Sequence, residues 1–338
     1  MIALFPGQGS QHVGMAKDLF DNFRLAQELF EEASDAAKVN LKKLCFDGPE
    51  ADLTATENAQ PALLLASTCA LRIAEKETGF QATLTAGHSL GEYSALVATG
   101  AIPFATAIRW VRERGLAMQK AVPRGEGSMT AVLNMEDALV EKMCAEATRL
   151  AAAKRPSSDY QHLSVAPLVA PANFNAPGQI VISGSVDALA EATALMKTPE
   201  FSGKAIPLQV SAPFHCALMK PSRDRMADVF AKTPDAEKPH ALKCPYIPNR
   251  TARITTEASL VLDFLVEQID HPVLWKQSME NLLQAHEGPE LKAVEFGPGK
   301  VLQGLAKRIA KNAGKTFQVE SVGDTAGIKN LMALGANA

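Results

Sequence analysis

The chain of 338 residues contains few cysteines and few aromatic residues, and its charges nearly balance. Its five cysteines are an odd number without a CxxC pair, so we expect neither a disulfide framework nor a structural zinc site. This cysteine usage favours the cytoplasm as the compartment. The formal net charge of −3 gives no reason to expect a nucleic acid or an anionic membrane as a partner.

Several common sequence signals are also missing. No apolar run approaches the roughly 18 residues of a membrane-spanning helix. The first ten residues, MIALFPGQGS, have neither a basic n-region nor a long apolar h-region, so we expect no secretory signal peptide. The P-loop pattern GxxxxGK(S/T) is absent, and the turn Gly7-Gln8-Gly9 has His12 where a dinucleotide fingerprint needs its third glycine. These absences exclude a P-loop and disfavour a dinucleotide-binding turn.

The chain does contain a regular alternation of strand-like and helix-like stretches, which favours an α/β architecture. The length suggests two domains, at roughly 150 residues for each. Apolar residues spaced three and four apart predict a helix over 15–35, and a further helix is expected over 104–122. The nearly apolar stretch 60–73 predicts a core helix.

The middle of the chain has a different order of elements. We expect a strand over 128–134, a helix over 135–150, strands within 163–175 and 178–184, a helix over 185–196 and a strand over 203–211. Ser185 is expected to cap the second of these helices. The order β-α-β-β-α-β is that of a ferredoxin-like unit. We therefore predict a small domain over 126–208, inserted into a larger α/β domain formed by 1–125 and 209–338.

One motif points to a nucleophile. The residues from Gly87 to Gly91 read GHSLG, which matches G-x-S-x-G between a predicted strand and a predicted helix that ends at Gly100. A strand-turn-helix elbow of this kind holds its serine in an exposed, strained position, and the glycines let neighbouring backbone pass closely. The free N–H groups of the following helix then point at the reacting oxygen. This context favours Ser89 as a nucleophile over a chance match in a glycine-rich turn.

The residues alone leave the general base open. Seven histidines compete for that role, and local pattern ranks His215 barely ahead of His286. A serine hydrolase would require the chain order serine, acid, histidine, which Ser89, Asp263 or Asp270, and His286 could supply. A non-catalytic docking domain is a third reading, although such a domain would not need a nucleophile turn.

Six motifs in one order carry a resemblance to a known family. They read FPGQGSQ, QPAL, GHSLGEYSAL, RGLAMQ, FHCALMKP and EFGPGKVLQGL. Over about residues 1–312 the chain resembles the acyltransferases of fatty-acid and polyketide synthesis, and among them the malonyl-CoA:acyl-carrier-protein transacylases. The resemblance implies an α/β-hydrolase-like large domain with an inserted ferredoxin-like small domain. That expectation agrees with the insertion predicted above.

The resemblance also implies roles for particular residues. Ser89 matches the acylated nucleophile and His215 the general base. Arg114 matches the arginine that binds the malonyl carboxylate. Gln8 and Leu90 match the two residues whose backbone N–H groups form the oxyanion hole.

Four further residues match motifs around that site. Gln268 resembles the residue whose main-chain carbonyl orients the histidine, and we place Asn249 with it in this role. Gln60 and Phe214 are expected to line the substrate pocket. Fatty-acid-type members often have serine where this chain has Phe214, whereas malonyl-selective polyketide members often have phenylalanine and methylmalonyl-selective ones serine. A phenylalanine there narrows the room around the substrate α-carbon, so we expect methylmalonyl-CoA to be a poor donor.

The implied reaction is ping-pong transfer of a malonyl group from malonyl-CoA to the phosphopantetheine thiol of acyl carrier protein, in fatty-acid biosynthesis. It requires no cofactor and no metal, and the family implies a monomer. A free-standing polyketide acyltransferase or an acyl hydrolase using the same serine is the alternative. The stretch 300–315 carries five basic residues and no acidic one, which fits either a docking patch for an acidic carrier protein or a solvated helix face.

Overall fold

A parallel sheet of five strands forms the centre of the larger domain in the computed structural model, which describes residues 1–335. Its order is β7-β2-β1-β8-β9, and all of its pairs are parallel. The strands are β1 (Ile2–Phe5), β2 (Leu84–Gly87), β7 (Tyr246–Ile247), β8 (Glu290–Phe296) and β9 (Thr316–Val322). The central strands β1 and β2 are buried along their whole length. Such continuous burial is typical of a parallel sheet covered on both faces.

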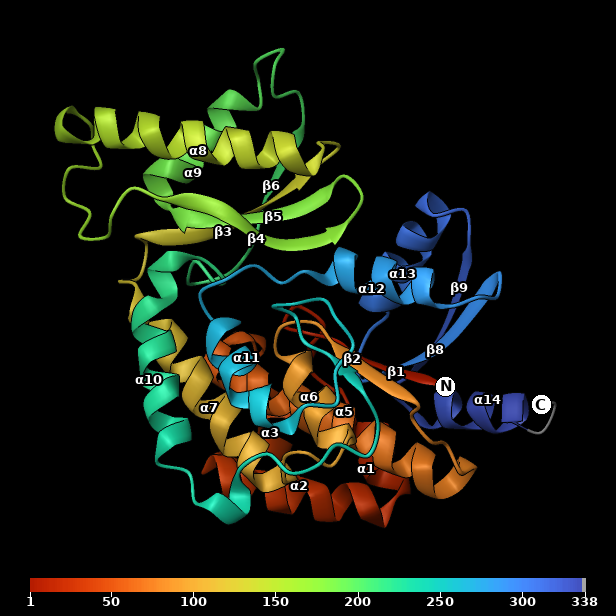
Figure 1. The fold of residues 1–338 in the computed structure, drawn as a ribbon. Helices are drawn as coiled ribbons and strands as arrows, with labels where there is room; N and C mark the ends of the chain where they lie inside the picture. Colours follow the sequence, from red (N-terminus) through yellow and green to blue (C-terminus); the bar gives the residue numbers. More distant parts are fainter. Residues whose placement is uncertain (336–338) are drawn as a thin grey trace.

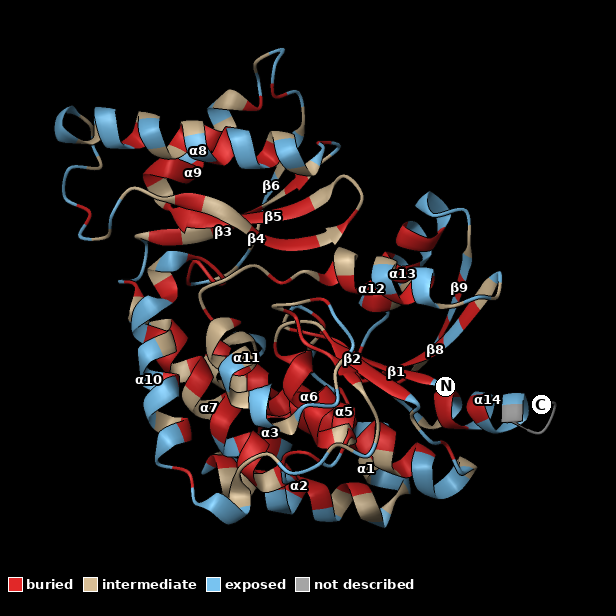
Figure 2. Cartoon of the chain, viewed as in Figure 1, coloured by how far each residue is buried: buried red, intermediate tan, exposed pale blue. Residues whose placement is uncertain are grey.

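Helices cover both faces of this sheet. Ala3 and Phe5 of β1 pack into one apolar cluster with α2 (Arg24–Ala37), α5 (Thr56–Thr78) and α7 (Phe104–Ala121). The alternate residues of β1 pack into a second cluster with α12 (Trp275–Ala285) and α13 (Val301–Asn312). The remaining helices of this domain are α1 (Lys17–Asn22), α3 (Leu41–Asp47), α4 (Glu50–Thr54), α6 (Gly91–Ala98), α10 (Lys220–Ala231), α11 (Val261–Glu267) and α14 (Thr325–Gly335). The buried residues gather in the central strands and the inner helix faces, shown red in Figure 2.

The smaller domain is an antiparallel sheet of order β4-β5-β3-β6. Its elements are β3 (Gly127–Leu133), α8 (Asp137–Lys154), β4 (Val169–Ala176), β5 (Gln179–Ser185), α9 (Val186–Leu195) and β6 (Lys204–Pro207). Helices α8 and α9 lie on the face turned away from the larger domain (Figure 1). The α/β fold with a ferredoxin-like second unit is therefore confirmed. We keep as a proposal that the small domain spans 126–208 and the larger one 1–125 and 209–338. Residues 336–338 of the latter lie outside the described part.

One local expectation was wrong and another was right only in part. The stretch 15–35 is not one helix, because Phe23 has an extended backbone (φ −131°, ψ 120°) that separates α1 from α2. Ser185 occupies the N-cap position of α9 as expected, but its hydroxyl makes no capping hydrogen bond to the helix. It donates to the carbonyl of Leu168 and accepts from the N–H of Leu168. Ser185 thus ties the end of β5 to the chain before β4.

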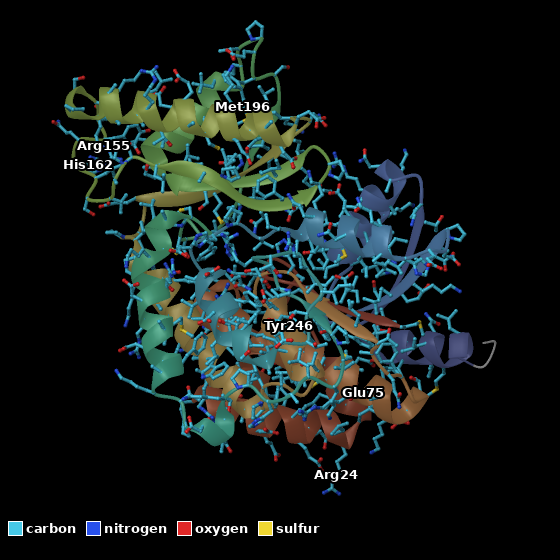
Figure 3. All side chains as sticks on the ribbon, viewed as in Figure 1. Arg24, Glu75, Arg155, His162, Met196 and Tyr246 are labelled. Atoms are coloured by element: carbon cyan, nitrogen blue, oxygen red, sulfur yellow. The ribbon has the colours of Figure 1, made fainter. Side chains whose placement is uncertain are left out.

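The connection between α8 and β4 lies at the outer edge of the small domain, where Figure 3 labels Arg155 and His162. Arg155 donates to Asp187 of α9 at 2.7 Å, which anchors this connection. Short 3-10 helices occur at Arg155–Ser157, Ala217–Met219, Asp235–Glu237 and Ala258–Leu260. Among the described residues, no helix combines the length and the apolar character needed to cross a membrane.

Candidate active site

Ser89 occupies the turn between β2 and α6 with φ at +52°, in the left-handed region. A non-glycine residue in this region is strained and needs its surroundings to hold it. A Cβ on Gly87 would lie 1.9 Å from the carbonyl carbon of Gly91, and a Cβ on Gly91 would lie 2.1 Å from the carbonyl oxygen of Phe5. Only glycine fits at these two positions, so the spacing of the motif follows from how closely the turn packs against β1.

The structure brings Ser89 together with His215. The Oγ of Ser89 lies 2.7 Å from Nε2 of His215, and Nδ1 of the same ring lies 2.9 Å from the main-chain oxygen of Gln268. A carbonyl can only accept, so Nδ1 carries the proton and Nε2 presents a lone pair to the serine. The alternative base, His286, bonds instead to the carbonyl of Glu290 at 2.8 Å. The triad order of a serine hydrolase is therefore not assembled here.

His215 is held in its neutral form. The residue is 3% exposed. Burial, followed by the positive charge of Arg114, lowers the pKa of His215 to about 3. A neutral imidazole that faces a serine hydroxyl is the arrangement a general base requires.

Arg114 of α7 carries a buried charge with uncharged partners. Its Nη1 donates to Oε1 of Gln60 at 2.8 Å, and its Nη2 donates to Oε1 of Gln268 at 2.7 Å and to Oγ of Ser89 at 3.2 Å. Its Nε is buried without a protein partner among the described residues. Burial lowers the pKa of this guanidinium. A planar cation with unused hydrogen-bonding capacity, this close to the serine, is suited to bind a carboxylate.

Asn249 occupies a different place from the one expected. Its Oδ1 accepts from the backbone N–H of Ser89, and its Nδ2 donates to the carbonyl of Gly87, both at 2.6 Å. Both ring nitrogens of His215 face Ser89 and Gln268 instead. The assignment of Asn249 as a histidine-orienting residue was therefore wrong, because its amide braces the serine turn.

A cavity of about 450 Å³ opens over the serine between the two domains. Met129 of β3 and Asn173 of β4 line its small-domain side. It is also lined by predicted site residues, namely Gln8, Gln60, Ser89, Leu90, Arg114, Phe214 and His215. Its size is that of an ordinary small-molecule site.

Comparison with known proteins decides the family. The acyl transferase domain profile matches residues 3–329. The chain belongs to the acyltransferase family. Its curated relatives include the malonyl CoA-acyl carrier protein transacylase of Salmonella typhimurium, 43% identical over 306 residues that cover 90% of this chain and 91% of the relative. The protein of the same name from Bacillus subtilis strain 168 is 42% identical over 316 residues, covering 94% and 92% of the two chains.

Solved structures agree with this assignment. An acyl carrier protein S-malonyltransferase from Vibrio cholerae superposes on the acyltransferase with a TM-score of 0.84 and 40% identity, covering 98% of this chain and 99% of the other. A malonyl-transacylase in complex with its type II polyketide-synthase acyl-carrier protein superposes with a TM-score of 0.86 and 37% identity, again covering 98% and 99%. The resemblance read from the six motifs is confirmed.

Sequence reasoning missed Glu92 of the acyltransferase, although the motif GHSLGEYSAL contains it. The residue is fully buried at the start of α6, and burial raises its pKa to about 7. An acidic residue directly before the apolar run of this helix was the available signal. His88, beside the serine, turns its Nε2 toward Oδ1 of Asn175 at 2.8 Å and so contacts the small domain.

Proposed function

We propose that this acyltransferase moves a malonyl group from malonyl-CoA to the phosphopantetheine thiol of acyl carrier protein through a malonyl-serine intermediate, in fatty-acid biosynthesis. The observation that carries the proposal is the position of Arg114, whose Nη2 lies 3.2 Å from Oγ of Ser89. An acyl group on this serine that ends in a carboxylate would have its charge within reach of the guanidinium. The relatives are named malonyl transacylases, which supports a malonyl group as the substrate.

In the first half-reaction, His215 takes the proton of Ser89 while Oγ attacks the thioester carbonyl. The backbone N–H groups of Gln8 and Leu90, which both line the cavity, stabilise the tetrahedral oxyanion. One such donor contributes about 3–4 kcal/mol to the transition state. The intermediate then collapses, the C–S bond breaks, and the imidazolium returns its proton to the sulfur of the leaving CoA.

In the second half-reaction, the thiol of the carrier's phosphopantetheine arm attacks the serine ester. His215 takes the thiol proton and passes it to Oγ of Ser89 as the C–O bond breaks. The main-chain carbonyl of Gln268 holds the ring throughout. A carbonyl stabilises the imidazolium less than the carboxylate of a serine protease triad would.

Arg114 accounts for selection of an acyl group with a carboxylate. The guanidinium can form two parallel hydrogen bonds with malonate. An acetyl group would leave a buried cation without its charged partner, which penalises acetyl-CoA as a donor. The same argument disfavours a general acyl hydrolase, which has no need for this arginine.

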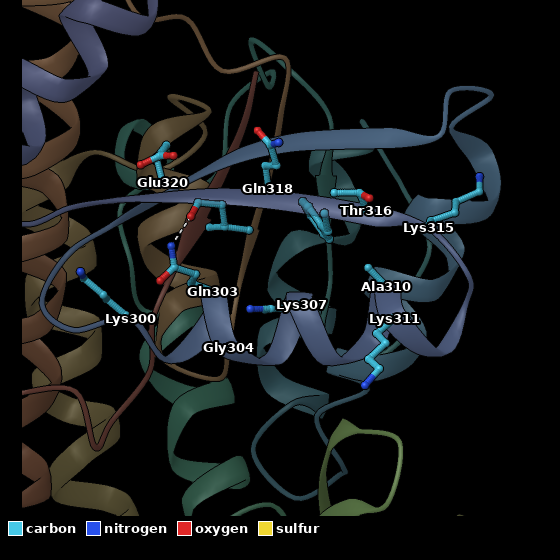
Figure 4. Close-up of a pocket in the computed structure, with 12 residues that line it drawn as sticks. Lys300, Gln303, Gly304, Lys307, Ala310, Lys311, Lys315, Thr316, Gln318 and Glu320 are labelled. Atoms are coloured by element: carbon cyan, nitrogen blue, oxygen red, sulfur yellow. Dashed lines mark hydrogen bonds between the residues drawn. The ribbon is translucent and has the colours of Figure 1, made fainter.

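The proposed carrier partner is acidic, and a basic groove between α13 and β9 offers it a surface. Figure 4 shows this groove of about 710 Å³, which is lined by Lys300, Lys307, Lys311 and Lys315 among others. Long-range attraction between opposite charges speeds the encounter of such partners. We propose that the carrier protein approaches over this groove.

Mass spectrometry after brief mixing with malonyl-CoA tests the proposal. We expect a malonyl adduct on Ser89 that acyl carrier protein removes, and no adduct on the Ser89→Ala variant. An adduct that water alone removes at the same rate would favour an acyl hydrolase. The absence of any adduct would favour a non-catalytic domain.

A further inference from the structure

The carboxylate of Glu92 lies directly behind the active site without lining the cavity. Its Oε2 accepts the side-chain N–H of Gln268 at 2.7 Å and the backbone N–H of Asn249 at 3.0 Å. Its Oε1 is buried without a partner among the described residues. Oε2 of Glu92 therefore holds both Gln268, at the end of α11, and Asn249, in the loop after β7.

Gln268 connects this acid to each group that the proposed reaction uses. Its Oε1 accepts from Arg114, and its Nε2 donates both to Glu92 and to the main-chain oxygen of Ser89, the latter at 3.0 Å. A flipped amide would put its N–H₂ group against the donors of Arg114 and its oxygen against the acceptor of Glu92. The two neighbours thus permit a single orientation of the Gln268 side chain. The main-chain oxygen of the same residue orients His215.

Asn249 connects the acid to the serine turn. Its backbone is held by Glu92, while its side chain bonds to Ser89 and Gly87 on either side of the elbow. A single hydrogen-bonded residue, Gln268 or Asn249, therefore lies between Glu92 and each of the nucleophile, the base and the guanidinium.

We propose that Glu92 is a positioning residue of this acyltransferase, whose Oε2 sets the places of Gln268 and Asn249 and through them of Arg114, His215 and Ser89. This inference rests on the proposed function. The role belongs to the hydrogen bonds of Oε2 and not to the charge of the carboxylate. The orientation of Gln268 keeps Arg114 bonded to an amide, so the guanidinium stays free of a direct ion pair that would compete with the substrate's carboxylate.

Protonation of Glu92 near neutral pH would remove the charge of the carboxylate, so it distinguishes a role of the charge from a role of the Oε2 hydrogen bonds. The charged and titratable groups around it are Arg114, Tyr93 on its own helix, and Tyr246 of β7, which Figure 3 labels within the larger domain. A proton on the unpartnered Oε1 leaves Oε2 as an acceptor for both N–H groups. Protonation should therefore leave the hydrogen-bonded positions intact.

Two conservative variants test the proposal in the full chain. Glu92→Gln removes the charge but retains an acceptor at the position of Oε2, whereas Glu92→Asp retains the charge but withdraws the acceptor by one methylene. We expect the rate of Ser89 acylation by malonyl-CoA to stay within about threefold of wild type in Glu92→Gln and to fall on the order of 10- to 100-fold in Glu92→Asp, since small displacements of reacting groups have effects of this size. The preference for malonyl-CoA over acetyl-CoA should fall in Glu92→Asp only.

Acylation rates are normalised to the amount of Ser89 that can be acylated, so a loss of folded protein does not mimic the effect. Glu295 supplies matched controls, because it is a second fully buried acid whose pKa burial raises to about 7, and it bonds to backbone N–H groups of α13 away from the cavity. Glu295→Gln and Glu295→Asp should both leave the acylation rate unchanged. The pH profile of Glu92→Gln around pH 7 should superimpose on that of wild type.

Any other order of the two Glu92 variants would overturn the inference. Equal rates would mean that the position of the acceptor is unimportant, and a larger loss in Glu92→Gln would mean that the charge acts. A wild-type protein that forms no adduct on Ser89 would refute the proposed function instead, so the two failures are distinguishable.

Discussion

At the scale of single residues, the charge of one buried group in the site controls the protonation of another. Arg114 is positively charged and its hydrogen-bond partners are uncharged, while His215 must stay neutral to act as a base. The positive charge of the arginine helps to keep the imidazole unprotonated, because a second positive charge nearby would be unfavourable. The group that selects the substrate thus also prepares the base.

The acylation rate should therefore fall only at a lower pH than it would in an enzyme whose base is a histidine with an ordinary pKa. With the pKa of His215 lowered to about 3, we expect no fall of the acylation rate around pH 6.5 from protonation of this ring. The free energy of unfolding behaves differently, since the unfolded chain binds a proton near pH 6.5. The contribution of His215 to stability is present above that pH and is lost as the pH falls toward 3. NMR titration of the imidazole checks the prediction, and a midpoint near 6.5 in the folded protein would contradict it.

Removal of the guanidinium should change both properties of the site. In Arg114→Gln we expect kcat/KM for malonyl-CoA to fall on the order of 100-fold, while acetyl-CoA is affected much less. The pKa of His215 should rise, because the second-largest cause of its depression is gone. Steady-state kinetics with both donors measures the first effect. Equal losses with malonyl-CoA and acetyl-CoA would show that Arg114 does not recognise the carboxylate.

Phe214 bears on the α-carbon of the acyl group. This residue precedes His215 in the sequence, lines the cavity and is 8% exposed. We expect methylmalonyl-CoA to be a poor donor and Phe214→Ser to improve it about 10- to 100-fold, which is the range for one methyl group in a pocket. Malonyl-CoA serves as the reference donor for each protein. Comparable turnover of the two donors by wild type would refute the prediction.

At the scale of elements, the serine turn depends on close contact between α6 and β1. The first residue of α6, Gly91, has the carbonyl oxygen of Phe5 where a Cβ would need to be. The helix cannot move away without shifting the serine turn that precedes it. Packing and chemistry are therefore coupled at this single contact.

Gly91→Ala should accordingly lower the free energy of unfolding by about 1–3 kcal/mol, as overpacking does, and also slow acylation. Gly304→Ala is the matched control, because a Cβ at this position in α13 meets no atom of residues 1–335 within 4 Å. We expect the control to be neutral or to stabilise by up to about 1 kcal/mol through helix propensity. Urea unfolding measures both variants. A Gly91→Ala protein as stable and active as wild type would contradict the steric argument.

At the scale of the whole molecule, the site lies between two domains and the basic groove lies at one edge of the sheet. Strand β9 is the last strand of the sheet, and the exposed Lys307 and Lys311 of α13 line the groove beside it. Arg308 of α13 also donates to Gln179 of the small domain at 3.2 Å. This helix thus borders both domains beside the proposed path of the carrier protein.

Charge reversal should separate the two half-reactions. In the Lys307→Glu, Arg308→Glu double variant we expect transfer to acyl carrier protein to fall about tenfold at low salt, while acylation by malonyl-CoA stays unchanged. Lys43→Glu on the exposed side of α3 is the control and should change neither step. Because Arg308 also bonds to Gln179, Lys307→Glu alone is compared with the double variant. Equal losses in both half-reactions would argue against docking at this groove.

The sequence by itself determined the local features and the family. The alternation of elements, the G-x-S-x-G turn and the six ordered motifs depend on spacings of a few residues, and such spacings are set by helix and strand periodicity and by turn geometry. They led to the α/β fold, the ferredoxin-like unit and Ser89. The extended backbone at Phe23 was not predicted, because the apolar spacing continues across the break.

Tertiary structure decided which side chains meet. The six motifs implied His215 as the base, but local pattern could hardly separate it from His286. Only the fold shows its 2.7 Å contact with Ser89, which lies 126 residues away in the chain. Asn249 turned out to bond to the serine turn, and Glu92 turned out to hold Gln268 and Asn249. These pairings join segments that only packing brings together, and a buried polar group takes whichever partner the fold places within reach.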